Sequence, residues 1–352
     1  MKALGRLMSF FLSRRKDSSH RTQTEAGPNF EEDPVTFSFT GEWLGGQGEG
    51  SCAGFLVENA RAGFRAVALL EGLGAAGREA VQCLEPALHS LFQDSGPLGS
   101  QEAVESLLRS ALKSARQAAS DRDVGLARSG CCLVAVVLSG SRLFVAGLGG
   151  CRAVLGRPAG NGEWRAVELT PDHSPFSPAE RSRIVGRGGW IGAAERSAFE
   201  GDLRVWPAPP DPLAPHSGPD ASADPGVRVT RAFGVTACRA LGLLGEPEVF
   251  SLQIRSEESF LILASELFWK LIPSTEACHV LRHFSNTPEA HLSKAARFLS
   301  EKARKRAKKL GLPAYYARPD YDPDCPDELA VLVLYLGRPP QKPKYAKPNP
   351  NI

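Results

Sequence analysis

Cysteine is the residue type here whose chemistry is easiest to test by spacing, because its thiol can bind a metal or form a disulfide. The chain has 8 cysteines in 352 residues, far fewer than a disulfide-held scaffold needs. None belongs to a Cys-x-x-Cys pair, which argues against a structural zinc site. Cys131 and Cys132 are adjacent in an apolar run, where thiols behave as small hydrophobic side chains. This pattern favours a reducing compartment, and we expect the cytoplasm, with the nucleus and an organelle as alternatives.

Basic side chains are the second group that could do chemistry, as a surface for an acidic partner. A predicted helix over 288–310 carries six in its last turns, namely Lys302, Arg304, Lys305, Arg306, Lys308 and Lys309. Cations complement the dipole at a helix C-terminus, so a solvated helix end explains them, and a nuclear-localisation or acidic-partner patch is the alternative. The formal net charge is only +3, from 42 Lys and Arg against 39 Asp and Glu. We therefore expect no nucleic-acid partner.

Residues 1–36 differ in composition from the rest of the chain. Apolar residues follow the spacing of one helical face, at Leu4, Leu7, Met8, Phe11 and Leu12. Basic residues surround them, and the first acid is Asp17. Three interpretations remain open for residues 1–16: a loosely packed terminus, an amphipathic helix on a membrane surface, or an organelle transit segment. Residues 17–36 are predicted to be a linker, and no stretch of the chain is apolar for long enough to predict a membrane span.

Strand-like runs and helices predict one domain over residues 37–336. The predicted strands are 36–40, 64–70, 131–138, 142–147, 152–155, 260–264 and 329–336. The predicted helices are 76–93, 101–119, 177–187 and 288–310. Ser177, with Pro178 at the first helical position and Glu180 two residues later, has the pattern of a capping box. Strand pairs joined by short loops, with helices that arrive in pairs, favour an α+β layered domain.

Two proline-rich segments interrupt or follow this pattern. The insert 206–226 holds seven prolines, which no helix or central strand accommodates. We expect an extended surface loop there, with a polyproline-type docking peptide as the alternative. The tail 337–352, which is rich in proline and lysine, is predicted to be disordered.

Short segments along the domain follow one another in an order that a known family shares. They are Ser129-Gly130-Cys131-Cys132, Gly149-Gly150-Cys151-Arg152-Ala153-Val154-Leu155, Leu169-Thr170-Pro171-Asp172-His173-Ser174-Pro175, Glu180, Arg183-Ile184, Gly188-Gly189-Trp190-Ile191, Thr230-Arg231-Ala232-Phe233-Gly234, Leu261-Ile262-Leu263-Ala264-Ser265 and Asp327-Glu328. Over residues 37–336 the chain resembles the metal-dependent protein phosphatases of the PP2C type. The resemblance implies a PP2C-like sandwich of two antiparallel β-sheets flanked by helix pairs, in α-β-β-α layers, which agrees with the layered prediction.

The resemblance also implies a chemistry. In that family, carboxylates at the sheet edges hold two Mg²⁺ or Mn²⁺ ions, which activate a water molecule for attack on phosphoserine or phosphothreonine. Carried over residue by residue, the metal positions are Glu71, the carbonyl of Gly72, Glu266 and Asp327. Glutamate replaces aspartate at positions 71 and 266, and it is one methylene longer.

Other positions depart from the family pattern in ways that remove chemistry. Leu73 stands where the family has the histidine that donates a proton to the leaving group, and Lys270 stands where it has an aspartate. Gly150 and Val235 replace two further aspartates, and residues 41–49 offer no arginine to grip phosphate. Loss of a single electrostatic stabiliser costs about 10²–10³-fold in rate, so joint losses are severe.

We therefore expect a pseudophosphatase, meaning a PP2C-like domain without a competent metal site, a catalytic residue or a bound cofactor. It would act as a protein-binding or regulatory module, with phosphoproteins or kinase complexes among its partners. The alternative is a weak Mg²⁺- or Mn²⁺-dependent protein serine/threonine phosphatase, with a site rebuilt from Glu71, Glu266 and Asp327. A third hypothesis treats residues 302–309 and the helix within 1–16 as an anchor on an acidic surface.

Overall fold

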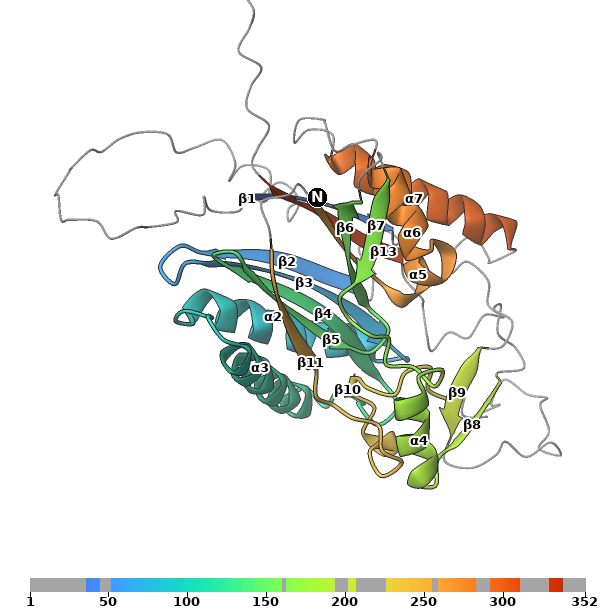
Figure 1. Cartoon of the computed structure of the whole chain (residues 1–352). Helices are drawn as coiled ribbons and strands as arrows, with labels where there is room; N and C mark the ends of the chain where they lie inside the picture. The colour runs from blue at the N-terminus through green and yellow to red at the C-terminus, as the bar shows by residue number, and fades with distance from the viewer. Residues whose placement is uncertain are drawn as a thin grey trace, which may run out of the picture. The chain divides into compact units, whose positions relative to one another are not determined.

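Contacts between residues divide the chain into two units, Met1–Asp33 and Pro34–Ile352. The computed structural model describes residues 36–44, 52–159, 163–193, 202–206, 226–254, 259–282, 292–310 and 329–337, and of 36–44 it describes the backbone only. All of these belong to the second unit. Its fold is built from two antiparallel sheets (Figure 1).

The first sheet has five strands in the order β1-β13-β12-β6-β7. Their bounds are Thr36–Leu44 for β1, Leu329–Gly337 for β13, Ser259–Ala264 for β12, Arg152–Pro158 for β6 and Trp164–Glu168 for β7. Ile262 in the central strand pairs with Val333 on one side and Val154 on the other. The apolar runs that the sequence shows at β12 and β13 thus form the middle of a sheet that is buried on both faces.

The second sheet runs β11-β5-β4-β3-β2, and the short strand β10 also pairs with β4. Their bounds are Glu248–Gln253 for β11, Arg142–Leu148 for β5, Gly130–Ser139 for β4, Phe64–Leu73 for β3, Cys52–Asn59 for β2 and Phe233–Gly234 for β10. A tight turn joins β4 to β5, and Gly140 lies in it with a φ of 59°, a conformation that glycine adopts without strain. The predicted hairpin is therefore confirmed.

Alternation along the strands divides the apolar side chains into three layers. In β3, Ala66, Ala68 and Leu70 face the helices, whereas Val67 and Leu69 face the other sheet. The inner layer is lined by both sheets, and each outer layer is lined by one sheet and its helices. A carboxylate placed on the inner face at the end of a strand therefore lies between the sheets.

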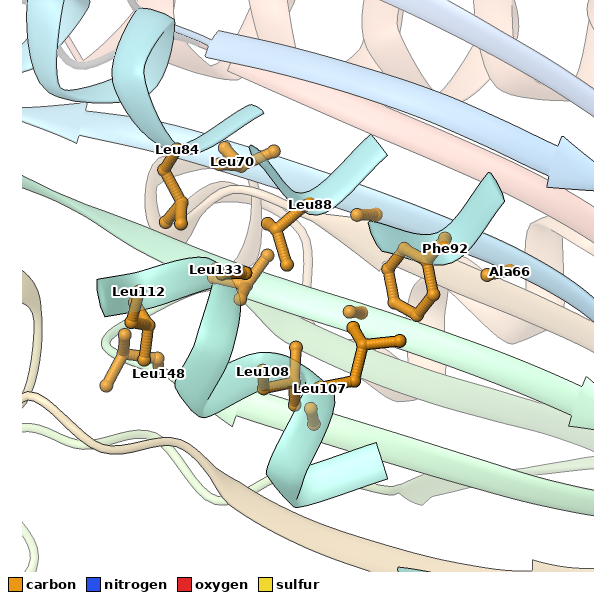
Figure 2. Packing of buried hydrophobic residues seen from close by; sticks show 14 of the residues in the cluster. Ala66, Leu70, Leu84, Leu88, Phe92, Leu107, Leu108, Leu112, Leu133 and Leu148 are labelled. Carbon is orange, nitrogen blue, oxygen red and sulfur yellow. The ribbon is translucent and has the colours of Figure 1, made fainter. Parts of the chain in front are cut away.

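Helices cover the outer face of each sheet (Figure 1). The pair α2 (Gly77–Asp94) and α3 (Gln101–Asp121) packs on the second sheet, and Figure 2 shows Leu84, Leu88 and Phe92 of α2 in that layer. The first sheet is covered by α5 (Glu266–Leu271), α6 (Ser274–Leu281) and α7 (Leu292–Lys309). The predicted α+β sandwich in α-β-β-α layers is confirmed.

A small module lies beside the sandwich and contains the short hairpin of β8 (Trp190–Ala193) and β9 (Leu203–Trp206). It also contains α4 (Pro178–Gly186). Ile184, Ile191 and Val205 form its apolar cluster, and the rings of Trp190 and Trp206 contact each other at a tilt of 51° with centroids 5.1 Å apart.

Some local predictions need correction. The predicted capping box at Ser177 is wrong, because its side chain makes no capping hydrogen bond and Glu180 instead binds arginines. Trp206, assigned to the proline-rich insert, is the buried last residue of β9. Residues 207–225, 1–35 and 338–352 lie outside the described residues, so the domain boundaries stay predictions. Among the described helices none is long and apolar enough to span a membrane.

Candidate functional site

Glu71 lies near the end of β3, on the face that packs against the other sheet. It pairs with Cys52 of β2 and Cys132 of β4, so three polarisable side chains share one row of the sheet. Glu71 is 1% exposed. A buried carboxylate needs hydrogen bonds or a cation to offset its lost hydration, so its contacts decide what this position can do.

The Oε2 atom of Glu71 is occupied by donors from the protein itself. The backbone N–H of Glu266 donates to it at 2.9 Å, and the thiol of Cys151 donates at 3.3 Å. Burial raises the pKa of Cys151 well above its usual value, and Cys132 and Glu71 raise it further, so the thiol stays protonated and remains a donor. Glu71 therefore joins β3 to α5 and to the residue just before β6 through hydrogen bonds.

Glu266 begins α5 and points toward the loop before β6. A Cβ built on Gly150 would lie 2.8 Å from Oε2 of Glu266 and 2.9 Å from its Cβ and Cγ atoms. Glu266 thus fills the space that a side chain at position 150 would need. Its Oε2 is buried without a hydrogen-bond partner among the described residues.

The ammonium group of Lys270 lies between two carboxylates. Its Nζ is 2.8 Å from Oε1 of Glu266, one helical turn earlier, and 3.3 Å from Oδ1 of Asp202, just before β9. Burial alone would lower the pKa of Lys270, and Arg228 also acts downward, but Glu266 and Asp202 outweigh both and hold the pKa above its usual value. We call Glu71, Gly150, Glu266 and Lys270 the centre of the protein. It therefore contains a permanent cation, Lys270, which links the small module to α5.

Leu73 and Val235 contribute only apolar surface. Both are buried in the layer between the sheets, so neither can bind a cation or transfer a proton. Val235 has φ 47° and ψ 48°, a left-handed conformation that β-branched residues rarely adopt. Its backbone N–H donates to the carbonyl of Ser129 at 2.8 Å, which helps to hold the turn.

Three of the four metal positions predicted from the sequence lie among the described residues. Glu71 and Glu266 meet through a hydrogen bond, and Gly72 follows Glu71 in β3 beside the first turn of α2. A Cβ on Gly77 would approach the carbonyl carbon of Gly72 to 2.8 Å, so glycine at 77 permits this close packing. Asp327 lies outside the described residues.

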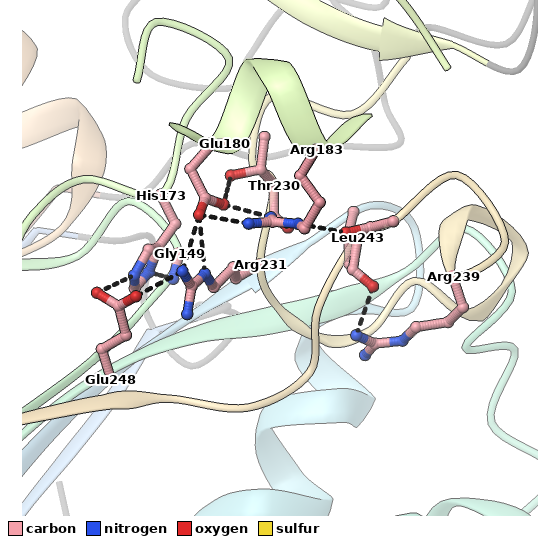
Figure 3. Close-up of polar contacts among 10 residues, drawn as sticks. Gly149, His173, Glu180, Arg183, Thr230, Arg231, Arg239, Leu243 and Glu248 are labelled. Atoms are coloured by element: carbon pink, nitrogen blue, oxygen red, sulfur yellow. Dashed lines mark hydrogen bonds and ion pairs between the residues drawn. The ribbon is translucent and has the colours of Figure 1, made fainter. Parts of the chain in front are cut away.

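A second polar cluster surrounds Glu180 (Figure 3). Arg183 and Arg231 both donate to its carboxylate, at 2.5–2.6 Å and 2.8–3.1 Å, and the hydroxyl of Thr230 donates as well. Burial would raise the pKa of Glu180, but these hydrogen bonds dominate and lower it to about 2. The cluster joins α4 to the segment before β10 and leaves the Glu180 carboxylate fully engaged.

His173 extends this cluster toward the loop before β6 (Figure 3). The backbone N–H of Gly149 donates to its Nδ1 at 3.1 Å, so the ring proton lies on Nε2, which is 3.3 Å from Oε2 of Glu248. Burial lowers the pKa of His173, with a further contribution from Arg231 that Glu248 only partly offsets. His173 is therefore a buried ring that accepts a hydrogen bond from Gly149 and faces the carboxylate of Glu248.

Arg152 connects two of the segments that carry the family resemblance, because it lies in one and contacts Asp172 in the other. It contacts Asp172 through two hydrogen bonds of 2.8 and 2.5 Å and Glu168 at 2.6 Å, and it lies over the ring of Trp269. The indole N–H of Trp269 donates to the carbonyl of Arg152 at 3.2 Å. The sequence segments that carry the resemblance thus form framework contacts.

Sequence reasoning missed three participants in these clusters. Asp202 and Glu248 stand in no motif, and only the fold brings them to Lys270 and His173. Cys151 was visible beside Gly150, but its hydrogen bond to Glu71 depends on two sheets meeting. The sequence does signal two local ion pairs, because Glu266 and Lys270 are four residues apart and Glu180 and Arg183 are three apart.

Comparison with known proteins agrees with this architecture. A family model described as Protein phosphatase 2C matches residues 60–309. A protein from Arabidopsis thaliana, "Probable protein phosphatase 2C 73", is 32% identical over 208 residues, which cover 59% of this chain and 48% of that protein. The chain spans about half the length of the curated relatives it matches.

Solved structures share the fold at low sequence identity. A serine-threonine phosphatase 2C from Toxoplasma gondii is 15% identical with a TM-score of 0.58, and the match covers 86% of this chain and 95% of that one. A C. elegans sex determining protein is 20% identical with a TM-score of 0.59, and the match covers 88% of this chain and 66% of that one. Because the family model matches well over half of the chain, this protein belongs to the protein phosphatase 2C family.

Proposed function

We propose that this PP2C domain does not carry out metal-dependent phosphate hydrolysis and works as a protein-binding or regulatory module. The observation that carries the proposal is the position of Lys270, whose ammonium group lies 2.8 Å from Glu266 and 3.3 Å from Asp202. A permanent cation at this point repels divalent ions and neutralises the carboxylates that would otherwise attract them.

The residues present do not fit the pair of Mg²⁺ or Mn²⁺ ions that the family implies. Such ions need several oxygen ligands with negative charge. Here Oε2 of Glu71 already accepts two hydrogen bonds, and Oε1 of Glu266 is paired with the cation of Lys270. Within the described ranges, no group of three or more His, Cys, Asp and Glu side chains is arranged to hold a metal ion.

The partner we propose is a protein, with phosphoproteins and kinase complexes as the first classes to test. What supports the proposal is that both sheets and their covering helices are formed among the described residues, whereas Lys270 and Glu266 occupy the space beside Glu71 and Gly150. A rigid domain of this kind can present a surface without turning over a substrate.

The experiment is a phosphatase assay of the full chain with a phosphoserine peptide and millimolar Mn²⁺, together with calorimetric titration of Mn²⁺. The variant is Glu71→Gln, and the matched control is Glu276→Gln. Glu276 is a carboxylate on α6 that pairs with Lys302 and Arg306 of α7. We expect no Mn²⁺-dependent phosphate release and no binding heat in the parent. Release that Glu71→Gln abolishes and Glu276→Gln preserves would overturn the proposal.

A second candidate is a weak Mg²⁺- or Mn²⁺-dependent protein serine/threonine phosphatase. The family match and the names of the related proteins, which call them probable protein phosphatases 2C, favour it. So does the meeting of two acidic residues, because the Glu71 carboxylate lies at hydrogen-bond distance from the backbone of Glu266. Asp327 would be the third ligand, and Asp327→Ala should then abolish the activity seen in the same assay.

A further inference from the structure

Helix α7 has one buried face and one charged face. Its small and apolar residues pack into the outer layer of the first sheet, namely Ala295, Ala296, Leu299, Ser300, Ala303 and Ala307. The helix lies along β1 and β13 (Figure 1). This packing fixes which side chains point away from the protein.

The outward face is strongly cationic. Its exposed residues are Lys294, Arg297, Phe298, Glu301, Arg304, Lys305, Lys308 and Lys309. They recur every three or four residues, so they form one stripe about 22 Å long. Neighbouring cations in the stripe are about 5–6 Å apart, within one Debye length at physiological salt, so they act together on a nearby surface.

The two remaining basic side chains of the C-terminal half of α7 behave differently. Lys302 contacts Glu276 at 2.7 Å, and Arg306 contacts it at 2.8 Å. They serve to hold α7 against α6. The cations of the stripe lie instead on the exposed side of the helix.

We propose that this stripe binds the surface of an anionic lipid bilayer. A flat, rigid row of cations matches a plane of negative headgroups, and each Lys or Arg near such a surface contributes about 1 kcal/mol. Phe298 is 49% exposed within the stripe, and an aromatic ring among cations fits the boundary between headgroups and acyl chains.

Two further observations favour lipid over a nucleic acid or an acidic protein. The net charge of +3 is too small to favour general nucleic-acid binding. The sequence also carries a second basic, amphipathic segment in residues 1–16, and membrane association commonly needs two weak signals. The inference is independent of the proposed function, because no residue of the centre belongs to the stripe.

The test is sedimentation of the full chain with vesicles of phosphatidylserine and phosphatidylcholine, and with vesicles of phosphatidylcholine alone. The variant is Lys305→Gln/Lys308→Gln. The matched control is Lys113→Gln/Arg116→Gln, which removes the same charge at the same spacing from the exposed face of α3. All four side chains are exposed, so both variants should keep the far-ultraviolet circular dichroism spectrum of the parent.

We expect binding only to the vesicles that contain phosphatidylserine. The α7 variant should bind on the order of 25-fold more weakly, at about fivefold for each of the two cations removed. The control should stay within about twofold of the parent, and Phe298→Ala should weaken binding without changing its salt dependence. Equal loss of binding in the variant and the control, or equal binding to both vesicle types, would overturn the inference. So would release of the protein from the vesicles by a DNA duplex added as competitor.

Discussion

Gly150 and Glu266 compete for the same space at the centre of this protein. A Cβ on Gly150 would lie 2.8–2.9 Å from three atoms of Glu266, which is closer than real Cβ contacts come. An acidic side chain at position 150 and the present Glu266 conformation therefore exclude each other. The two departures from the family pattern at these positions are physically linked.

This linkage predicts a double-mutant result. Gly150→Ala should lower the free energy of unfolding by about 1–3 kcal/mol, as overpacking does. Added to Glu266→Gly, the same change should cost much less, because the clashing Cβ, Cγ and carboxylate are gone. Urea unfolding of the parent, the two single variants and the double variant gives the coupling free energy between positions 150 and 266. Gly186→Ala is the control, since its Cβ would meet no atom within 4 Å. Additive losses at positions 150 and 266 would contradict the linkage.

The Glu180 cluster predicts acid sensitivity in a defined range. The pKa of Glu180 is lowered to about 2 in the folded protein, against a usual value of 4.5, so the folded state favours the ionised form. The stabilisation is present above pH 4.5 and is lost as the pH falls toward 2. Urea unfolding at several pH values should show a steeper loss in the parent than in Glu180→Gln. If the free energy of unfolding fell equally steeply with pH in both proteins, Glu180 would not be the origin of the acid sensitivity.

The fold was predictable because its central strands are buried on both faces. Continuous apolar runs at 131–138 and 260–264 can be recognised without knowing their neighbours. The edge strands β7 and β11 were missed because their exposed and buried residues follow no clear alternation. Short α5 was missed for a related reason: six residues are too few to show a helical period.

The site was predictable only where its residues stand beside a recognisable strand. Glu71, Lys270 and Gly150 could be named from the sequence as departures from a pattern. The contacts of these residues could not be predicted. Asp202, the partner of Lys270, is 68 residues away in the sequence and is brought close only by the small module. Contacts across such separations depend on packing, which no local pattern encodes.

The cysteines should differ widely in reactivity. Burial raises the pKa of Cys131 and Cys151 well above the usual value of 9.0 and that of Cys278 to about 12, so all three stay as unreactive thiols. Cys52 is partly exposed and should be alkylated first among the described cysteines. Timed labelling of the native protein with N-ethylmaleimide, followed by peptide mass spectrometry, measures the order. Fast labelling of Cys151 would contradict its burial beside Glu71.

Replacing Lys270 should release the β8–β9 hairpin from α5. Lys270→Met leaves Asp202 and Glu266 without their shared cation, and breaking a buried pair in this way costs up to about 3–5 kcal/mol. The expected result is faster hydrogen exchange of the backbone amides in β9. Lys302→Met is the matched control, because it breaks an ion pair to Glu276 far from the hairpin.

The Asp202→Asn variant separates this effect from general unfolding. It removes the other partner and leaves the pair of Lys270 with Glu266 intact, so the hairpin amides alone should exchange faster. If the ion pair is the link, the double variant Lys270→Met/Asp202→Asn should exchange no faster in β9 than the Lys270→Met protein. Unchanged exchange in both single variants would show that the hairpin is held by its apolar cluster and that Lys270 serves only to neutralise Glu266.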